Sequence, residues 1–258
     1  KEIMVIQNGQ SYFKKILQHI NLNNIVISEF DKKISNFPNL YDNHISEATY
    51  YRLFCNDYLP KNIETIIYID ADIICVENPI KLIKADTNKL IRDDKTISTK
   101  TELIRSEKSQ HTFERLDMSS SKYFNAGVMN INFKKWVEMK IDFNEKLKEY
   151  SDKLEYWDQD LLNHIFDGDY QELDIRLNKV IDFAFYEYQK GTLDVKKIID
   201  DGSLIHFAGS HKPWSVNGIM CNLSEIYQSE FRKISTSDYH ITHKIRSMSL
   251  TYLVINIF

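Results

Sequence analysis

The clearest hydrophobic pattern in the chain is an apolar run that ends in acidic residues. Residues 66–69, Ile-Ile-Tyr-Ile, are followed at once by Asp70-Ala71-Asp72. A short run rich in β-branched residues predicts a buried strand. Strand side chains alternate, so Asp70 and Asp72 point to the same side. Two carboxylates at the carboxyl end of a strand can hold a hard divalent cation, although an Asp-x-Asp also ends many ordinary strands.

Further apolar patterns predict the elements before this strand. Short runs indicate strands at residues 3–6 and 25–27, three-four spacing indicates helices at residues 11–20 and 44–58, and the polar residues 31–43 indicate a loop. Arg52 lies among aromatic residues on the second helix. Two readings stay open for it, a solvated surface arginine and one that turns inward to meet an anion.

The segment after the acidic pair contains one polar stretch without a clear pattern and one apolar stretch with a recognisable motif. Residues 86–120 are polar and rich in Lys, Asp and Ser, which favours a mobile surface segment or lid. In residues 123–131, Ala126 and Gly127 leave room for a ligand or a backbone, and the following Val128, Met129 and Ile131 indicate a strand. Asn125 could reach sugar hydroxyls or simply form a turn.

A second acidic motif begins a helix. Residues 133–150 predict one helix, and Asp158-Gln159-Asp160 leads into another, whose apolar stripe spans residues 161–166. Acids at a helix N-terminus are favoured by the dipole and the unpaired N–H groups. Capping accounts for one acid, with Asp158 as the candidate, but not for the whole motif. His164 on this helix is expected to be exposed.

The last informative stretch combines a histidine, a glycine and a lysine. After short strands and turns over residues 170–200, residues 204–207 predict a strand that contains His206 and runs into Ala208-Gly209-Ser210-His211-Lys212. A lone strand histidine is more often structural than a ligand. The glycine turn and lysine that follow suit phosphate oxygens, and a nitrogen ligand beside two carboxylates favours manganese over calcium.

Composition sets the limits of these readings. The 258 residues are 43% hydrophobic and 27% charged with net charge −4, which is typical of a globular α/β protein and does not suggest nucleic-acid binding. The three cysteines form no C-x-x-C, so neither a disulfide framework nor a zinc knuckle is expected, and a reducing compartment fits. Neither a signal peptide nor a membrane-spanning run is expected.

We expect one domain over residues 1–234 and a tail over residues 235–258. The tail carries Lys244 and Arg246 and then an aromatic, apolar end. It either lies on an anionic membrane surface or packs on the core.

Taken together, the motifs resemble the retaining glycosyltransferases of family 8, in particular bacterial lipopolysaccharide and lipooligosaccharide galactosyl- and glucosyltransferases. Five segments carry the resemblance, in the family's order: residues 44–52, 68–72, 123–127, 158–163 and 206–214. The resemblance implies a GT-A fold, an α/β architecture with a mixed, mostly parallel sheet flanked by helices. It also implies transfer of galactose or glucose from a UDP-sugar to a saccharide or lipid-linked saccharide, in the cytoplasm or on the inner face of the cytoplasmic membrane.

The resemblance also implies roles for individual residues. The metal, Mn²⁺ with Mg²⁺ as the alternative, would be held by Asp70, Asp72 and His206. On the donor side, Gly209 and Lys212 would hold the diphosphate, and Arg52 would contact phosphate or sugar. Asn125, Asp158 and Gln159 would line the sugar pocket. Four more residues would lie beside the donor: His44, Thr49, Ala71 and His211. Gln159 and Asp158 are the catalytic candidates.

The chemistry of the reaction agrees with these roles. Expelling a diphosphate is easier when a metal and Lys212 neutralise its charge, and carboxylate or amide oxygens can stabilise an oxocarbenium-like anomeric carbon. For retention we favour attack by the acceptor from the leaving-group face over a nucleophilic Gln159 or Asp158. A neutral amide is a poor nucleophile and the departing phosphate can act as base.

Two departures and two rival readings remain. The chain starts at a Lys near the family's second strand, so we expect the strand that recognises uracil to be missing. The family's acid after the metal motif falls near Thr101 and Glu102, and neither is assigned. One rival is a haloacid-dehalogenase-type phosphatase with Asp169 and Asp174 as further acids, although Ile73 stands where that family has Thr or Val. The other is a sugar-nucleotide-binding relative with impaired catalysis.

Overall fold

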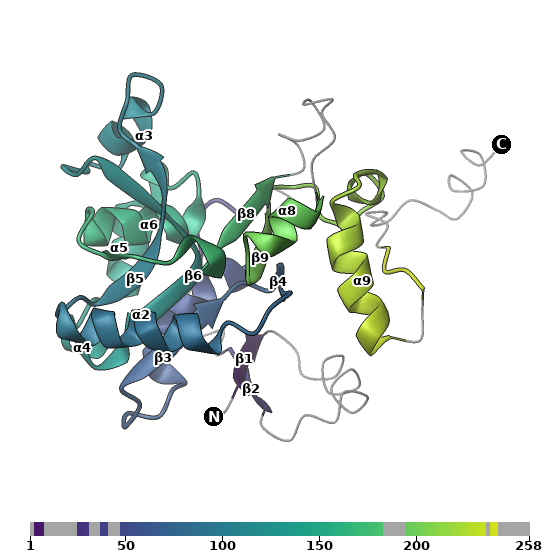
Figure 1. Ribbon diagram of the computed structural model, residues 1–258. Helices are drawn as coiled ribbons and strands as arrows, with labels where there is room; N and C mark the ends of the chain where they lie inside the picture. Colours follow the sequence, from purple (N-terminus) through teal and green to yellow (C-terminus); the bar gives the residue numbers. More distant parts are fainter. Residues whose placement is uncertain are drawn as a thin grey trace. The chain divides into compact units, whose positions relative to one another are not determined.

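The computed structural model describes residues 3–7, 25–30, 37–40, 47–182, 195–235 and 238–241. The chain forms two compact units, residues 1–71 with 78–178 and residues 72–77 with 179–258. Both are drawn in Figure 1. The predicted helix at residues 11–20, His44, Lys244 and Arg246 lie outside the described residues. The predicted division at residue 234 therefore stays a prediction.

The first unit holds a mixed sheet with the strand order β3-β6-β5-β7. Its members are β3 (Thr65–Ile69), β5 (Ile97–Ile104), β6 (Lys122–Asn132) and β7 (Gln171–Glu172). β6 pairs antiparallel with β3 and β5, and β5 pairs in parallel with β7. β3 ends directly before Asp70, as predicted. Among the described strands it forms an edge of the sheet, and its residues are half-buried or exposed and not fully buried.

The helical elements of the first unit are shorter than the sequence predicts. In place of a helix over residues 44–58 there is a 3₁₀ helix, η1 (Glu47–Asp57), kinked at Phe54. In place of one helix over residues 133–150 there are α4 (Phe133–Glu138) and α5 (Phe143–Glu149), capped by the side chains of Asn132 and Asp142. Each cap accepts hydrogen bonds from N–H groups in the first turn of its helix. In one continuous helix, these N–H groups would instead bind main-chain carbonyls. The remaining elements are α2 (Ile80–Arg92), α3 (Gln110–Arg115), η2 (Ser151–Lys153), α6 (Trp157–Phe166) and η3 (Ile175–Leu177).

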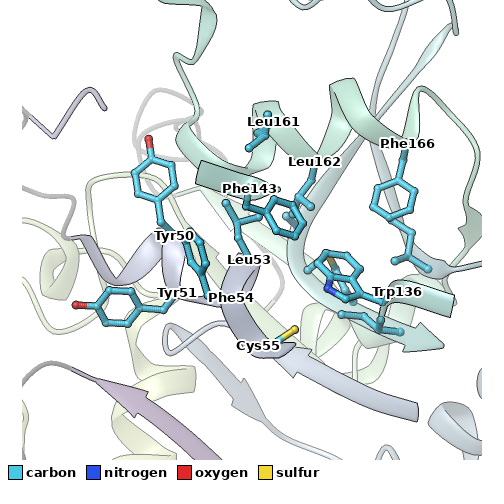
Figure 2. Packing of buried hydrophobic residues seen from close by; sticks show 14 of the residues in the cluster. Tyr50, Tyr51, Leu53, Phe54, Cys55, Trp136, Phe143, Leu161, Leu162 and Phe166 are labelled. Atoms are coloured by element: carbon cyan, nitrogen blue, oxygen red, sulfur yellow. The ribbon is translucent and has the colours of Figure 1, made fainter. Parts of the chain in front are cut away.

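The core of the first unit lies between the sheet, η1 and α6. Figure 2 shows η1 side chains such as Tyr50 and Leu53 packed with Leu161 and Leu162 of α6 and with Trp136. Met129 and Ile131 of β6 belong to the same cluster. Asn130 lies between them, and its amide donates instead to Asp86 and Thr87 of α2. Side chains alternate along a strand, so α2 and the aromatic core lie on opposite faces of β6.

The prediction of a mobile lid over residues 86–120 is wrong. The segment completes α2 and forms β5 and α3. Ser98 and Thr99 are fully buried in the sheet despite their polarity. The Ser98 hydroxyl donates to Asp86 at 2.8 Å, and the Thr99 hydroxyl donates to the carbonyl of Asn125 at 2.7 Å. Internal hydrogen bonds replace the water that these polar residues would otherwise require.

Two irregularities interrupt the pairing of β5 with β6. Thr99 pairs with Met129 and Lys100 with Asn125, so residues 126–128 are extra on β6. Further along, Thr101 pairs with Phe124 and Leu103 with Tyr123, which leaves Glu102 extra on β5. Bulges re-aim side chains and release main-chain groups from the ladder, and they are frequent beside active sites.

The second unit has its own three-stranded sheet in the order β4-β9-β8. β4 (Ile73–Cys75) pairs antiparallel with β9 (Leu204–Ala208), which pairs in parallel with β8 (Lys179–Asp182). The remaining elements are α8 (Val195–Asp200), η4 (Gly218–Met220) and α9 (Ser224–Ile234). Ile205 and Phe207 of β9 are buried in the core of this unit with Leu223 and Ile226. The predicted strand around His206 is confirmed.

A third sheet pairs β1 (Ile3–Gln7) in parallel with β2 (Ile25–Glu29), which confirms both predicted strands. Over the described strands, parallel and antiparallel pairings are equally frequent, so the sheets are mixed without the expected excess of parallel pairs. In the described part of the chain, no helix has the length and apolar character needed to cross a bilayer.

Candidate functional site

Arg52 turns inward and binds carboxylates of the protein itself. Its Nη2 lies 3.0 Å from Oδ1 of Asp70, and its Nε lies 2.6 Å from Oδ2 of Asp158. A third donor, Nη1, binds the carbonyl of Ala126. The guanidinium lies over the Tyr68 ring at 4.0 Å, and the Tyr68 hydroxyl donates to Asp70. The inward reading of Arg52 is confirmed, while a contact with the donor stays a prediction.

Asp158 is a buried carboxylate, 2% exposed, at the start of α6. The Thr49 hydroxyl donates to its Oδ1 at 2.6 Å. Burial raises the pKa of Asp158 to about 6, against the opposing effect of Arg52. The prediction that Asp158 caps the helix is wrong. The N–H groups of Glu155 and Tyr156 bind Asp160 instead, at 2.7 and 2.8 Å.

The raised pKa of Asp158 predicts a pH dependence of stability. An acid with a folded-state pKa near 6 against 3.8 unfolded favours folding below pH 3.8 and loses that contribution as the pH rises through 6. We expect the stability of the parent relative to Asp158→Asn to fall by roughly 3 kcal/mol over this window. Urea unfolding of both proteins at several pH values, followed by tryptophan fluorescence, measures it. Parallel pH curves would contradict the prediction.

The side-chain amide of Gln159 is held by three hydrogen bonds. Its Oε1 accepts from the N–H of Ala126 at 2.9 Å. Its Nε2 donates to Glu102 Oε2 and to the Tyr123 hydroxyl, both at 3.1 Å. The bulges described above make this arrangement, because they free the main chain of Ala126 and aim Glu102 out of the ladder.

Asn125 is a buried strand residue and forms no turn. Its Oδ1 accepts from the N–H of Gly127 at 3.0 Å and from Asn178 at 2.9 Å, and its Nδ2 lies 3.5 Å from Glu102. Glu102 therefore joins Gln159 and Asn125, a role that sequence reasoning did not assign. Only the displaced register of β5 explains it, and the apolar pattern does not reveal that register.

His164 also departs from expectation, because it is half-buried. Its Nδ1 lies 2.8 Å from the carbonyl oxygen of Leu116, and its ring lies 3.9 Å from that of Tyr150. The Tyr150 ring covers a face of His164 that the helical pattern assigns to solvent. This histidine is structural.

In the second unit, Asp72 is surrounded by His206 and Lys212. The Lys212 ammonium lies 2.5 Å from Asp72 Oδ2 and donates to the carbonyl of Phe207 at 2.7 Å. The Nε2 atom of buried His206 lies 3.3 Å from Asp72 Oδ1. Burial alone would raise the pKa of Asp72, but His206 and Lys212 outweigh it and lower the pKa to about 2. Asp72 is therefore a carboxylate at neutral pH.

The loop after β9 is built around glycine. Gly209 has φ +78°, and a Cβ there would lie 3.0 Å from Asp182 Oδ1, so a larger residue would be strained. His211 and Lys212 follow in the same loop, both half-buried. The predicted glycine turn is confirmed, and its binding of a diphosphate stays a prediction.

Asp70 lies near the end of the first stretch of the first unit, residues 1–71, and Asp72 is the first residue of the second unit. Only Ala71 separates them, and two residues span at most about 7 Å between Cα atoms. Asp70, Asp72 and His206 each offer one ligand atom to a metal ion. The fit is supported by Asp72 Oδ1, a buried oxygen that lies 3.3 Å from His206 Nε2 but forms no hydrogen bond of ordinary geometry among the described residues. Carboxylates with one imidazole suit Mn²⁺ or Mg²⁺.

The family model described as "Glycosyl transferase family 8" matches residues 3–218. The chain belongs to glycosyl transferase family 8. This membership bears out the resemblance drawn from the motifs, and it leaves the phosphatase reading without support. Asp169 and Asp174, the acids on which that reading depends, pair with Lys95 and Arg176.

Two curated relatives of this family 8 chain illustrate the range of likeness. It is 31% identical over 212 residues to a putative glycosyltransferase of Haemophilus influenzae, covering 79% of this chain and 60% of that protein. It is 30% identical to a lipopolysaccharide 1,2-glucosyltransferase of Escherichia coli, covering 65% of this chain and 49% of that protein. The chain thus spans about half to three-fifths of the length of these relatives.

Solved structures confirm the GT-A fold of this family 8 member. A galactosyltransferase LgtC, crystallised with donor and acceptor sugar analogues, has a TM-score of 0.70 at 23% identity, covering 92% of this chain and 86% of that one. The glycosyltransferase GlyE of Streptococcus pneumoniae has a TM-score of 0.52 at 19% identity, covering 92% of this chain and 59% of that one. At these identities the likeness concerns the fold alone.

Proposed function

We propose that this family 8 protein is a metal-dependent, retaining hexosyltransferase that moves galactose or glucose from a UDP-sugar to a saccharide acceptor in lipopolysaccharide or lipooligosaccharide synthesis. Family membership and the activity by which the E. coli relative is named support this proposal. The observation that carries it is Asp72, a half-buried carboxylate that faces His206 and Lys212 and follows Asp70 by two residues.

In this proposal Asp70, Asp72 and His206 hold the metal. Mn²⁺, or Mg²⁺ in its place, would supply positive charge to the diphosphate as the glycosidic bond breaks. Lys212 adds a second cation from the loop that Gly209 opens. Arg52 fixes one Asp70 oxygen and the Tyr68 hydroxyl binds the same atom, so this ligand is oriented before any ion arrives.

The residues around Gln159 form the proposed sugar side. Gln159, Asn125 and Glu102 present amide and carboxylate groups, and hexose hydroxyls are recognised by such groups. Asp158 is 2% exposed and bound by Arg52 and Thr49, which disfavours it as a nucleophile. The amide of Gln159 is a weak nucleophile too. We therefore favour attack by the acceptor hydroxyl on the face that the diphosphate leaves, with the phosphate accepting the proton.

A panel of UDP-sugars tests the proposal. UDP-galactose, UDP-glucose and their N-acetyl forms are incubated with the protein, Mn²⁺ and a truncated oligosaccharide acceptor, and UDP release is measured. Release with one UDP-hexose that EDTA abolishes and acceptor accelerates is expected. Donor binding without release under all these conditions would instead support the reading of a relative with impaired catalysis.

Lys212→Ala is expected to weaken UDP binding in the presence of Mn²⁺ by about 10-fold, because a hydrogen bond to a charged group is lost. Isothermal titration of UDP into the Mn²⁺-loaded proteins measures this difference. Lys233→Ala is the matched control, because Lys233 is an exposed lysine of the same unit that pairs with Glu230. Equal affinity of the parent and Lys212→Ala would remove Lys212 from the diphosphate site.

A further inference from the structure

We propose that Tyr123 is a positioning residue for the reaction, and that the chain Arg115–Asp160–Tyr123 fixes the orientation of the Gln159 amide. This inference rests on the proposed function, because it assigns Gln159 to the sugar side of a glycosyltransferase. Every contact that carries it lies within the first unit of the chain.

The chain begins at Asp160, which is fully buried. Its Oδ2 accepts from Arg115 Nη1 at 2.8 Å and from the N–H groups of Glu155 and Tyr156 at 2.7 and 2.8 Å. The other oxygen, Oδ1, accepts from the Tyr123 hydroxyl at 2.7 Å. A carboxylate that is ion-paired to an arginine can only accept hydrogen bonds. The proton between Asp160 and Tyr123 therefore belongs to the tyrosine.

Because its hydroxyl donates to Asp160, Tyr123 can only accept a hydrogen bond from Gln159. The phenol is 1% exposed, and burial together with the charge of Asp160 raises its pKa well above the ordinary value, so the hydroxyl keeps its proton. The hydroxyl has a single proton and donates it to Asp160. Its oxygen is left to accept, and Gln159 Nε2 is the donor at 3.1 Å.

The amide of Gln159 is then determined at both ends. Glu102 accepts the second N–H of Nε2, and the N–H of Ala126, which can only donate, binds Oε1. A flipped amide would place its N–H groups against the N–H of Ala126 and its oxygen against the Glu102 carboxylate. The orientation of an Asn or Gln amide is assigned from its hydrogen-bond partners, and here every partner supports the same orientation.

This fixed orientation decides which atom of the Gln159 amide can face the substrate. Both N–H groups of the amide and one lone pair of Oε1 are used within the protein, so the capacity that the described contacts leave is the second lone pair of Oε1. Gln159 thus presents a fixed partial negative charge, which stabilises positive charge as it develops on a sugar carbon. Preorganised dipoles of this kind cost no reorientation during the reaction.

Tyr123→Phe tests the proposal, because it removes one oxygen and keeps the buried ring. We expect kcat for UDP-hexose-dependent transfer to fall about 10- to 100-fold, as small misplacements of catalytic groups do, with the donor KM nearly unchanged. Tyr51→Phe is the control. Tyr51 is also buried, 3% exposed, and donates to a carboxylate, Glu47, at 2.7 Å.

Two further measurements separate positioning from general structural damage. The double variant Tyr123→Phe with Gln159→Ala should be no less active than Gln159→Ala alone, since the tyrosine acts through the glutamine. In ¹⁵N-glutamine-labelled protein, the side-chain N–H resonances of Gln159, assigned by their loss in Gln159→Ala, should shift in Tyr123→Phe and stay in place in Tyr51→Phe.

The outcomes are distinct. Independent, multiplicative effects of the two substitutions, or unmoved Gln159 resonances in Tyr123→Phe, would overturn the positioning role. The resonance measurement needs no activity, so it decides the inference even if no UDP-sugar is turned over. A parent protein that turns over no UDP-sugar counts against the proposed function alone.

Discussion

Asp72→Asn is expected to lower Mn²⁺-dependent release of UDP from the donor by about 100-fold or more, since even changes behind a metal ligand cost 10- to 100-fold. The asparagine keeps the shape of the side chain and removes the charge that His206 and Lys212 now face. The fold should persist, because the main chain of Asp72, whose carbonyl binds the N–H of Phe207 at 3.0 Å, is unchanged. UDP release and Mn²⁺ binding followed by electron paramagnetic resonance measure the effect.

Asp201→Asn serves as the matched control for Asp72→Asn. Asp201 belongs to the same unit and is exposed, 3.9 Å from the ammonium of Lys179. It should leave both Mn²⁺ binding and UDP release at the parent level. If Asp72→Asn turned over donor as fast as this control does, Asp72 would not be a metal ligand.

Arg52→Met should produce the largest loss of stability, about 3–5 kcal/mol, which is typical when one partner of a buried ion pair is removed. Methionine replaces the aliphatic volume but leaves Asp70 and Asp158 without their shared cation. The carbonyl of Ala126 loses a donor as well. Urea unfolding followed by tryptophan fluorescence measures the change in the free energy of unfolding.

Arg105→Met is the comparison for this loss. Arg105 also has a partly buried guanidinium, which lies over the Phe113 ring at 4.9 Å and donates to the carbonyl of Met118. Within the described residues it forms no ion pair with a carboxylate, so its replacement should cost clearly less. Equal losses for the two arginines would mean that the carboxylates of Asp70 and Asp158 do not depend on Arg52.

The parts of the site that could be predicted from sequence are those coded by adjacent residues. An apolar run followed by Asp70 and Asp72 identifies a strand end, and a strand containing His206 followed by Gly209 and Lys212 identifies a turn with basic character. In both cases period-two burial and local turn chemistry decide the structure, so a single stretch holds the information.

The parts that could not be predicted depend on contacts far apart in the chain. Residues 97–104 look like a surface segment because they are polar, yet β5 is paired on both sides, and its polar side chains bind α2 and β6. The bulge that aims Glu102 at Gln159 is set by the register of two strands. The N–H groups of Glu155 and Tyr156 bind Asp160, while Asp158 pairs with Arg52. None of these partners is adjacent in the sequence to the residue whose position it fixes.

The bulge at residues 126–128 has a consequence for how this protein can vary. Both polar groups that Ala126 contributes, the N–H to Gln159 and the carbonyl to Arg52, belong to the peptide backbone. Drift at this position to another small amino acid leaves both contacts in place. Proline would remove the N–H that binds Gln159. An insertion or deletion that changes the number of extra residues in the bulge would break both contacts. Natural variation here should therefore conserve spacing more strictly than residue identity.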